Sequence, residues 1–349
     1  MMPGEDVQER LAGLVAASHA AWESPVVASI LGTSDPERVA EALRTAVSDA
    51  VGAVVTGARF YEPGVGIVVG VDVADGRTLV AKLHRAEYTS RERLADLVGV
   101  QAELATAGLP APMPITGPVA VGHGWLTVEE HRSGEAADGY HPAVRREMAT
   151  VLRDFVNVAG SRPSGSRLGS WLGPPVIDDL WPEPHDLRFD FAGTARGAEW
   201  IDETARAARV VLSATELPAV IGHLDWRVQN LGFASGKVVA IYDWDSVGLV
   251  PEAALVGVAS AIHPVDWRLG LPDPLPSLAQ LGGFVADYER ARGAPFDDTE
   301  RDVLSAAQRW IVSYGARCQH SDDVRRIFPD VDHTKGWPRL LRELLRLRP

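Results

Sequence analysis

The stretch IGHLDWRVQNLGFASGKVVAIYDWDSVG, residues 221–248, is the most informative part of this chain. His223 stands two positions before Asp225, and Asn230 follows Asp225 by five positions. Asp243 comes after a segment whose β-type residues flank Gly236, a pattern that predicts a hairpin. A carboxylate, an amide and a second carboxylate in this order can converge on one metal ion and one hydroxyl group. The spacing therefore indicates a catalytic loop followed by a metal-binding loop.

This set of side chains suits phosphoryl transfer from ATP. That reaction needs a carboxylate to orient the acceptor hydroxyl and take its proton, oxygen ligands for Mg²⁺, and a cation against the phosphates. Mg²⁺ prefers oxygen ligands, and it is usually held by a few protein groups together with phosphates and water. Other hydrolytic and nucleotide-binding patterns are missing from the sequence: H-E-x-x-H, G-x-S-x-G and GxxxxGK[ST] do not occur.

The pattern His-x-Asp-x-x-x-x-Asn followed by Ile-Tyr-Asp-Trp resembles the catalytic and metal-binding loops of aminoglycoside phosphotransferase-like kinases. The resemblance implies that Asp225 is the catalytic base, that Asn230 and Asp243 bind Mg²⁺, and that His223 braces the loop. It covers about residues 50–320, but only residues 221–248 are specific. Leu224 stands where the family has glycine, and this departure concerns the acceptor more than the nucleotide.

Upstream residues occur in the order that the resemblance implies for ATP binding. Lys82 lies in an apolar strand segment, where the family has its phosphate-contacting lysine, with Gly64 and Gly66 before it as a degenerate glycine-rich loop. Asp96, on a predicted helix, is the expected partner of the lysine. The segment that precedes Gly134 is similar to the family's hinge, and adenine contacts are expected at the following positions: Glu129, Glu130, His131 and Arg132.

Acceptor recognition is expected near Asp225, in the C-terminal part of the chain. An aromatic face with carboxylates suits a sugar or an amino sugar. The candidates for acceptor contacts are Trp226, Arg227, Asp245 and Asp266, of which Asp245 is also a candidate supporting partner of the metal ligand. Trp267 and Trp310 are instead expected to pack in the core.

The predicted elements divide into two lobes of different class. Helices are expected over 5–22, over 35–51 with Ser34 and Glu37 as a capping box, and over 90–107. Asp75-Gly76 predicts a hairpin between the strands Ile67–Val73 and Thr78–His84, and a further strand is expected over 124–129. From residue 141 the pattern is helical, apart from a β-type island over 220–244 and a long loop over 159–185.

The expected fold is therefore α+β and protein-kinase-like. Residues 1–130 are expected to form an N-terminal lobe with a small antiparallel sheet on the ATP phosphate side. Residues 131–349 are expected to form a mainly helical C-terminal lobe with the catalytic loop and the acceptor pocket. The function expected is transfer of the γ-phosphate of ATP, with Mg²⁺, to a hydroxyl of an aminoglycoside, an amino sugar, or a related sugar or antibiotic. The alternative is a catalytically silent protein with a kinase fold, which serves as a nucleotide-binding or regulatory protein.

The composition of the chain is compatible with an enzyme that acts on a small molecule. The formal net charge of -13 disfavours a nucleic-acid partner and would suit a cationic acceptor. One cysteine, Cys318, cannot form an internal disulfide, the N-terminus does not read as a secretory signal, and no apolar stretch reaches the length of a membrane span. A cytoplasmic location is expected, and the sequence leaves the oligomeric state open.

Overall fold

The computed structural model describes residues 6–18, 24–160, 168–172, 178–271, 273–328 and 335–347. The chain divides into two compact units. Unit 1 consists of Met1–Thr106, Pro112–Arg132 and His185–Leu187. Unit 2 consists of Ala107–Ala111, Ser133–Pro184 and Arg188–Pro349. A mixed α+β chain of this kind, with one five-stranded antiparallel sheet, two two-stranded antiparallel sheets and ten α-helices in the described residues, has the fold class that the sequence predicts.

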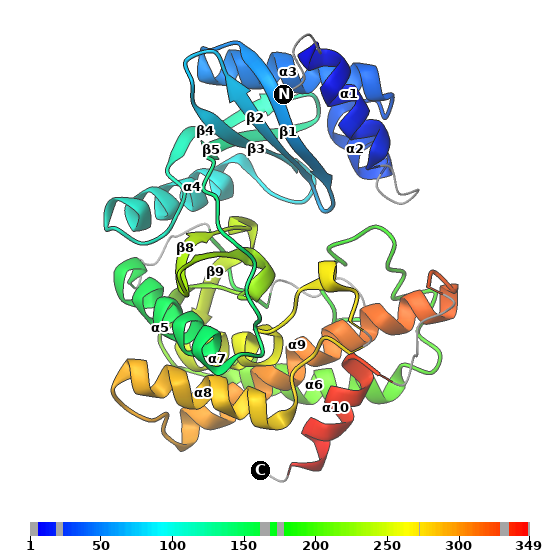
Figure 1. Ribbon diagram of the computed structural model, residues 1–349. Helices are drawn as coiled ribbons and strands as arrows, with labels where there is room; N and C mark the ends of the chain where they lie inside the picture. Colours follow the sequence, from blue (N-terminus) through cyan, green and yellow to red (C-terminus); the bar gives the residue numbers. More distant parts are fainter. Residues whose placement is uncertain are drawn as a thin grey trace. The chain divides into compact units, whose positions relative to one another are not determined.

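Unit 1 is built on a five-stranded antiparallel sheet of order β1-β2-β3-β5-β4 (Figure 1). The predicted hairpin is confirmed, because β2 and β3 pair antiparallel from Ile67↔Leu83 to Asp72↔Thr78. Gly76 has a φ of 88° in its turn, a conformation that glycine adopts without a Cβ penalty. The strand bounds are β1 Val55–Pro63, β2 Ile67–Val73, β3 Thr78–Arg85, β4 Pro114–Val121 and β5 Gly124–Glu130.

One face of this sheet packs against helices α1 (Val7–Ala17), α2 (Ser24–Leu31) and α3 (Pro36–Val51) (Figure 1). The single helix expected over 5–22 is wrong in its extent, because α1 ends at Ala17 and α2 is a separate helix; residues 19–23 lie outside the described part of the chain. The helix expected over 35–51 is confirmed. Its cap is Asp35, which accepts from the backbone N–H of Arg38, and the prediction of Ser34 was wrong.

Strand alternation places Lys82 away from these helices. Leu79, Ala81 and Leu83 belong to the core between the sheet and α1–α3. Successive side chains of a strand point to opposite faces, so Val80 and Lys82 face the other side. Helix α4 (Arg91–Thr106), close to the predicted 90–107, contacts β4.

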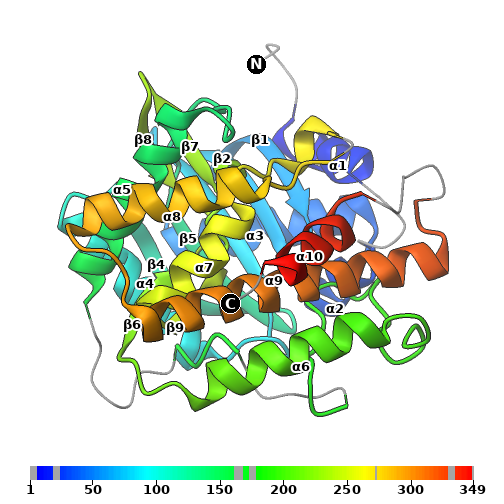
Figure 2. The ribbon, with the colours of Figure 1, turned by 90° about the horizontal axis from the view of Figure 1, so that it is seen from below.

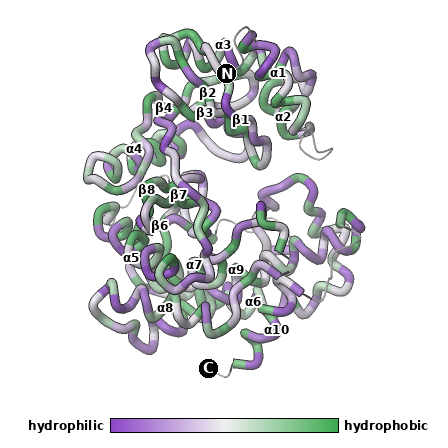
Figure 3. Tube along the Cα trace, viewed as in Figure 1, coloured by the Kyte–Doolittle hydropathy of each residue, from purple (hydrophilic) through white to green (hydrophobic). Residues whose placement is uncertain are grey.

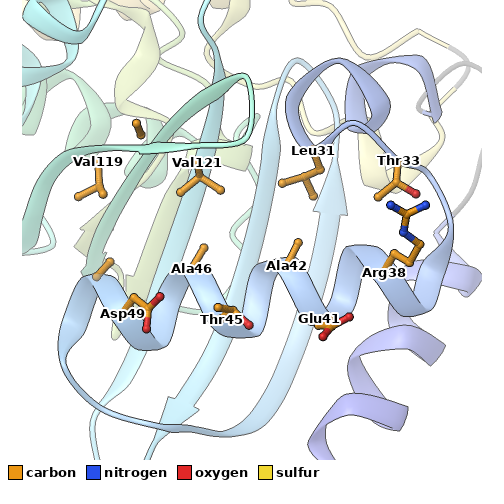
Figure 4. A pocket seen from close by; sticks show the side chains of 12 residues that line it. Leu31, Thr33, Arg38, Glu41, Ala42, Thr45, Ala46, Asp49, Val119 and Val121 are labelled. Atoms are coloured by element: carbon orange, nitrogen blue, oxygen red, sulfur yellow. The ribbon is translucent and has the colours of Figure 1, made fainter.

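Figure 4 shows an open groove of unit 1, with a volume of about 790 Å³, between α3, β4 and the segment that joins α2 to α3. Apolar side chains such as Leu31, Val119 and Val121 line it together with charged ones on α3. None of the residues that the sequence predicts for the site lies in this groove.

Unit 2 is a helical assembly around α7 (Glu252–Ile262), in which every residue from Ala253 to Ile262 is buried. Helix α7 is mainly hydrophobic (Figure 3). Helices α8 and α9 pack on its two sides (Figure 2). Helix α5 packs on α8, and α6 and α10 pack on α9. The bounds are α5 Pro142–Ala159, α6 Glu199–Ala214, α8 Leu278–Arg292, α9 Asp298–Arg325 and α10 Trp337–Arg346. No helix in the described ranges is long and apolar enough to cross a membrane.

The β-type island of unit 2 forms two small antiparallel pairs. Strand β6 (Ala219–His223) pairs with β9 (Val247–Pro251), and β7 (Leu231–Ala234) pairs with β8 (Lys237–Ile241). The short 3₁₀ turns η1 (Val228–Asn230) and η2 (Trp244–Ser246) connect them. Every predicted residue of the catalytic and metal-binding loops lies in this island.

Candidate active site

The loop between β6 and η1 brings three of the predicted residues together. Asn230 donates from Nδ2 to the backbone carbonyl of Asp225 at 2.9 Å and to its carboxylate Oδ2 at 2.8 Å. His223 is fully buried directly before this loop. The five-residue spacing therefore closes a compact loop in which the amide of Asn230 fixes the carboxylate of Asp225.

His223 connects this loop to the one that carries Asp243. Its Nδ1 lies 3.3 Å from the backbone nitrogen of Asp225, and its Nε2 lies 2.8 Å from the carbonyl oxygen of Tyr242. A backbone N–H only donates and a carbonyl only accepts, so the ring is neutral, with its proton on Nε2. The rings of Phe155, Trp226 and Trp244 surround the imidazole.

The carboxylate of Asp225 is also bound by Arg227. Arg227 Nε donates to Oδ1 and Nη2 donates to Oδ2, both at 2.5 Å. Burial raises the pKa of Asp225, but the positive charge and hydrogen bonds of Arg227 outweigh burial and hold the pKa below its ordinary value. Asp225 is therefore ionised at neutral pH.

Asn230 and Asp243 can supply oxygen ligands. Because the Nδ2 atom of Asn230 donates to Asp225, the Oδ1 atom is the part of the amide that can face a metal ion. Asp243 has left-handed backbone angles, φ 59° and ψ 57°, which are uncommon for a residue with a side chain and often occur at functional positions. One amide oxygen and one carboxylate fit Mg²⁺, which takes most of its remaining ligands from phosphates and water. Within the described ranges, no group of three or more His, Cys, Asp or Glu side chains is placed to hold a metal ion.

In unit 1, Lys82 lies beside a buried carboxylate on the neighbouring strand β5. The Lys82 Nζ atom is 3.1 Å from Glu129 Oε1. Glu129 Oε2 accepts from Nε2 of Gln101 on α4 at 2.7 Å, and the same nitrogen donates to the carbonyl of Pro112. The sequence reasoning missed this role of Glu129, although Lys82 and Glu129 stand on adjacent strands with alternating faces. The pairing of Lys82 with Asp96 stays a prediction.

Gly64 and Gly66 form the tight turn between β1 and β2. The Gly64 N–H donates to the carbonyl of Gly66 at 2.8 Å. A Cβ on Gly66 would lie 2.3 Å from the carbonyl oxygen of Leu83, whereas a Cβ on Gly64 would meet nothing within 4 Å. Glycine at position 66 thus lets the turn approach the backbone of β3.

The segment predicted as a hinge includes the end of β5. The N–H of Glu130 donates to the carbonyl of Met113, and the N–H of His131 donates to the carbonyl of Thr78. Those two donors are thus used inside unit 1. Adenine contacts remain a prediction for Glu129, Glu130, His131 and Arg132. They would have to use backbone groups other than the N–H groups of Glu130 and His131.

The predicted acceptor residues differ in accessibility. Trp226 is only 1% exposed, and its indole N–H donates to the carbonyl of Met148, so the prediction of an acceptor contact there was wrong. Asp266 is buried and bound at both oxygens by Arg268, while Asp245 is exposed in η2. Trp310 is buried as expected, but Trp267 is 46% exposed, so the expectation of core packing at Trp267 was wrong.

A family model described as "Phosphotransferase enzyme family" matches residues 68–296 of the 349 residues. The match spans β2, β3, the catalytic loop and helix α8. The chain belongs to this phosphotransferase family. No curated protein sequence matches it significantly.

Several solved structures with a similar fold are kinases or phosphotransferases of small molecules. An amicoumacin kinase, in complex with AMP-PNP, Ca²⁺ and Ami, has a TM-score of 0.60 at 12% identity, and the alignment covers 86% of this chain and 91% of that one. An ethanolamine kinase of Plasmodium vivax has a TM-score of 0.54 at 12% identity, with 99% and 95% covered. A spectinomycin phosphotransferase, in complex with ADP and spectinomycin, has a TM-score of 0.51 at 12% identity, with 88% and 94% covered.

The fold is therefore kinase-like, and the family is one of phosphotransferases. At identities near 12%, the similarity shows that this chain has the same fold as these structures, and it does not show which substrate this chain uses.

Proposed function

We propose that this chain is an ATP-dependent kinase that transfers the γ-phosphate to a hydroxyl group of a small molecule. The observation that carries this proposal is the arrangement of Asp225, Asn230 and Tyr242 around the buried His223. One imidazole holds the backbone of Asp225 and the residue before Asp243, while Asn230 fixes the Asp225 carboxylate. An acid–base group and two oxygen ligands are thereby ordered before any substrate binds, as transfer chemistry requires.

Each residue has a distinct role in the proposed reaction. Asp225 orients the acceptor hydroxyl and takes its proton, and its ionised state at neutral pH supports that role. Asn230 and Asp243 would hold Mg²⁺, which supplies charge neutralisation of the phosphates when it is bound. Lys82 binds the phosphates, and Glu129 keeps its ammonium in place. His223 positions both loops and does not touch the reacting atoms.

The acceptor that we propose is an aminoglycoside, an amino sugar, or a related sugar or antibiotic. The family supports a small molecule, and the net charge of -13 would favour a cationic one. The half-exposed Trp267 adjoins the catalytic loop, because its backbone N–H donates to Oε1 of Gln229 at 3.0 Å. An exposed indole at this position can stack on a sugar ring or a cation.

A catalytically silent kinase fold is the second candidate. Two observations favour it: the N–H groups of Glu130 and His131 are already bonded, and Arg227 covers the carboxylate of Asp225. A silent protein would bind Mg-ATP without turnover in the presence of any acceptor.

The test is ADP formation from Mg-ATP over a panel of hydroxylated small molecules that includes aminoglycosides, amino sugars and neutral sugars. Turnover that depends on the acceptor and disappears in Asp225→Ala supports the kinase. Mg-ATP binding without turnover against the whole panel favours the silent fold.

A further inference from the structure

Arg227 binds the carboxylate of Asp225, which the proposed reaction needs as its base. An ionised carboxylate offers about four lone-pair sites. Two of those of Asp225 accept from Arg227 and a third accepts from Asn230, all within 2.8 Å. A carboxylate bound in this way has little capacity left for a hydroxyl group.

The guanidinium of Arg227 faces more negative charge than it neutralises. Asp225, Asp243 and Asp266 all act on it electrostatically. Asp266 already has Arg268 on both of its oxygens. A second cation close to Asp225 and Asp243 would compete with Arg227 for their negative charge.

Binding of Mg-ATP changes this balance. Asn230 and Asp243 would hold Mg²⁺, which would add a second cation near the guanidinium, and the triphosphate would supply new anionic oxygens. Arginine binds phosphate through two parallel hydrogen bonds, which are about twice as strong as neutral ones. The flexible side chain of Arg227 has several rotatable bonds through which its guanidinium could change partner.

We propose that Arg227 is a phosphate-binding residue, which rests on Asp225 in the free protein and moves to the γ-phosphate when Mg-ATP binds. This inference rests on the proposed function, and it moves Arg227 from the acceptor, where the sequence reasoning placed it, to the nucleotide. In the transfer step, the acceptor oxygen forms a bond to the γ-phosphorus as the bond from that phosphorus to the β,γ-bridging oxygen breaks. The hydroxyl proton goes to the vacated carboxylate of Asp225, ADP leaves, and Arg227 keeps all its protons.

The chain contains a matched control for Arg227. Asp266-Trp267-Arg268 repeats the tripeptide Asp225-Trp226-Arg227, and Arg268 binds Asp266 in the same way, from Nε at 2.8 Å and from Nη2 at 2.6 Å. The side chain of Arg268 is 58% exposed, compared with 18% for Arg227. Removing Arg268 breaks an ion pair of the same type without touching Asp225.

The experiment compares the affinity for two probes, Mg²⁺ with the β,γ-imido analogue of ATP and Mg-ADP, in the wild type, Arg227→Met and Arg268→Met. We expect Arg227→Met to weaken binding of the imido analogue about tenfold and to leave Mg-ADP within about twofold, because only the analogue has a γ-phosphate. Transfer to the acceptor should fall about 100-fold, a size typical for loss of one transition-state cation or donor. Arg268→Met should weaken the two nucleotides to the same extent, because it leaves Asp266 uncompensated near Arg227 without removing a contact to the γ-phosphate.

Arg227→Lys guards against a variant that fails to fold. It keeps the positive charge but loses the planar fork, so we expect a smaller loss of the same kind, confined to the imido analogue. Equal weakening of both nucleotides in Arg227→Met and Arg227→Lys, or no change in either, would overturn the inference. Neither outcome would affect the proposed function, which fails separately if the wild type does not bind Mg-ATP.

Discussion

His223 binds the carbonyl oxygen of Tyr242 through Nε2 at 2.8 Å, and so connects the loop of Asp225 to the loop of Asp243. Because the same ring accepts from the backbone N–H of Asp225, it fixes two chain segments at once. The contact joins residues that are 19 positions apart.

Replacing His223 with phenylalanine should lower kcat at least tenfold. Phenylalanine keeps the aromatic packing against Phe155 and Trp226 but removes the hydrogen bond to the carbonyl of Tyr242, at a cost of about 0.5–1.5 kcal/mol in the free energy of unfolding. Urea unfolding and steady-state kinetics measure the two effects. Unchanged kcat with lowered stability would show that the ring only stabilises the fold.

Glu129→Gln should raise KM for ATP about tenfold, because Lys82 then loses the neighbouring charge that holds its ammonium. Stability should also fall, since removal of one partner leaves the other charge poorly compensated in a partly buried position. Glu87→Gln is the control, because Glu87 is an exposed acidic residue of the same unit. An unchanged KM for ATP in Glu129→Gln would contradict a positioning role for Glu129.

Gly66→Ala and Gly64→Ala separate packing from nucleotide contact in the β1–β2 turn. The new Cβ at position 66 would lie 2.3 Å from the Leu83 carbonyl, so we expect a loss of about 1–3 kcal/mol in the free energy of unfolding. Gly64→Ala meets no atom within 4 Å and should leave the melting temperature unchanged. If the β1–β2 turn approaches the phosphates of ATP, as the sequence predicts, Gly64→Ala should still raise KM for ATP. Equal stability of the two variants would argue against the packing explanation.

His263 makes stability depend on pH. It is fully buried, its Nδ1 donates to the carbonyl of Ser260, and burial lowers its pKa from 6.5 to about 3. The folded state keeps the ring neutral where the unfolded chain already binds a proton, so stability is present above pH 6.5 and is lost as the pH falls. The loss between pH 7 and pH 5 should be about 2 kcal/mol.

His263→Phe removes this titration and keeps an aromatic ring against Phe284, whose ring centroid is 4.9 Å from that of His263. The difference between denaturant midpoints at pH 7 and pH 5 should therefore shrink in the variant. The same pH dependence in both proteins would rule out His263 as its source.

Local patterns predicted much of the fold, and the failures have physical causes. The β2–β3 hairpin was predictable because Asp75-Gly76 is a strong turn signal and the register follows from it. Strand β4 was missed because its sequence, PITGPVAV, has two prolines and a glycine, which an edge strand tolerates. The helix predicted over 5–22 extends past the observed end of α1 at Ala17, and α2 was not predicted.

In the site, spacing predicted the closure of Asp225 on Asn230, since both lie in one short loop. It could not predict that Glu129 lies next to Lys82, because the two residues are far apart in the sequence and their contact depends on the register between β3 and β5. The burial of Trp226 also depends on tertiary packing, through its contact with Phe155 and its hydrogen bond to Met148.

The most direct test of the central claim is a pair of variants, Asp225→Ala and Asp243→Ala, measured for Mg-ATP affinity and for acceptor-dependent ADP formation. We expect Asp225→Ala to bind Mg-ATP about as well as the wild type and to lose turnover by a factor of at least about 100. Asp243→Ala should lose both binding and turnover, because it removes a ligand of the metal. Full activity in Asp225→Ala would contradict the assignment of the base, and with it the proposed mechanism.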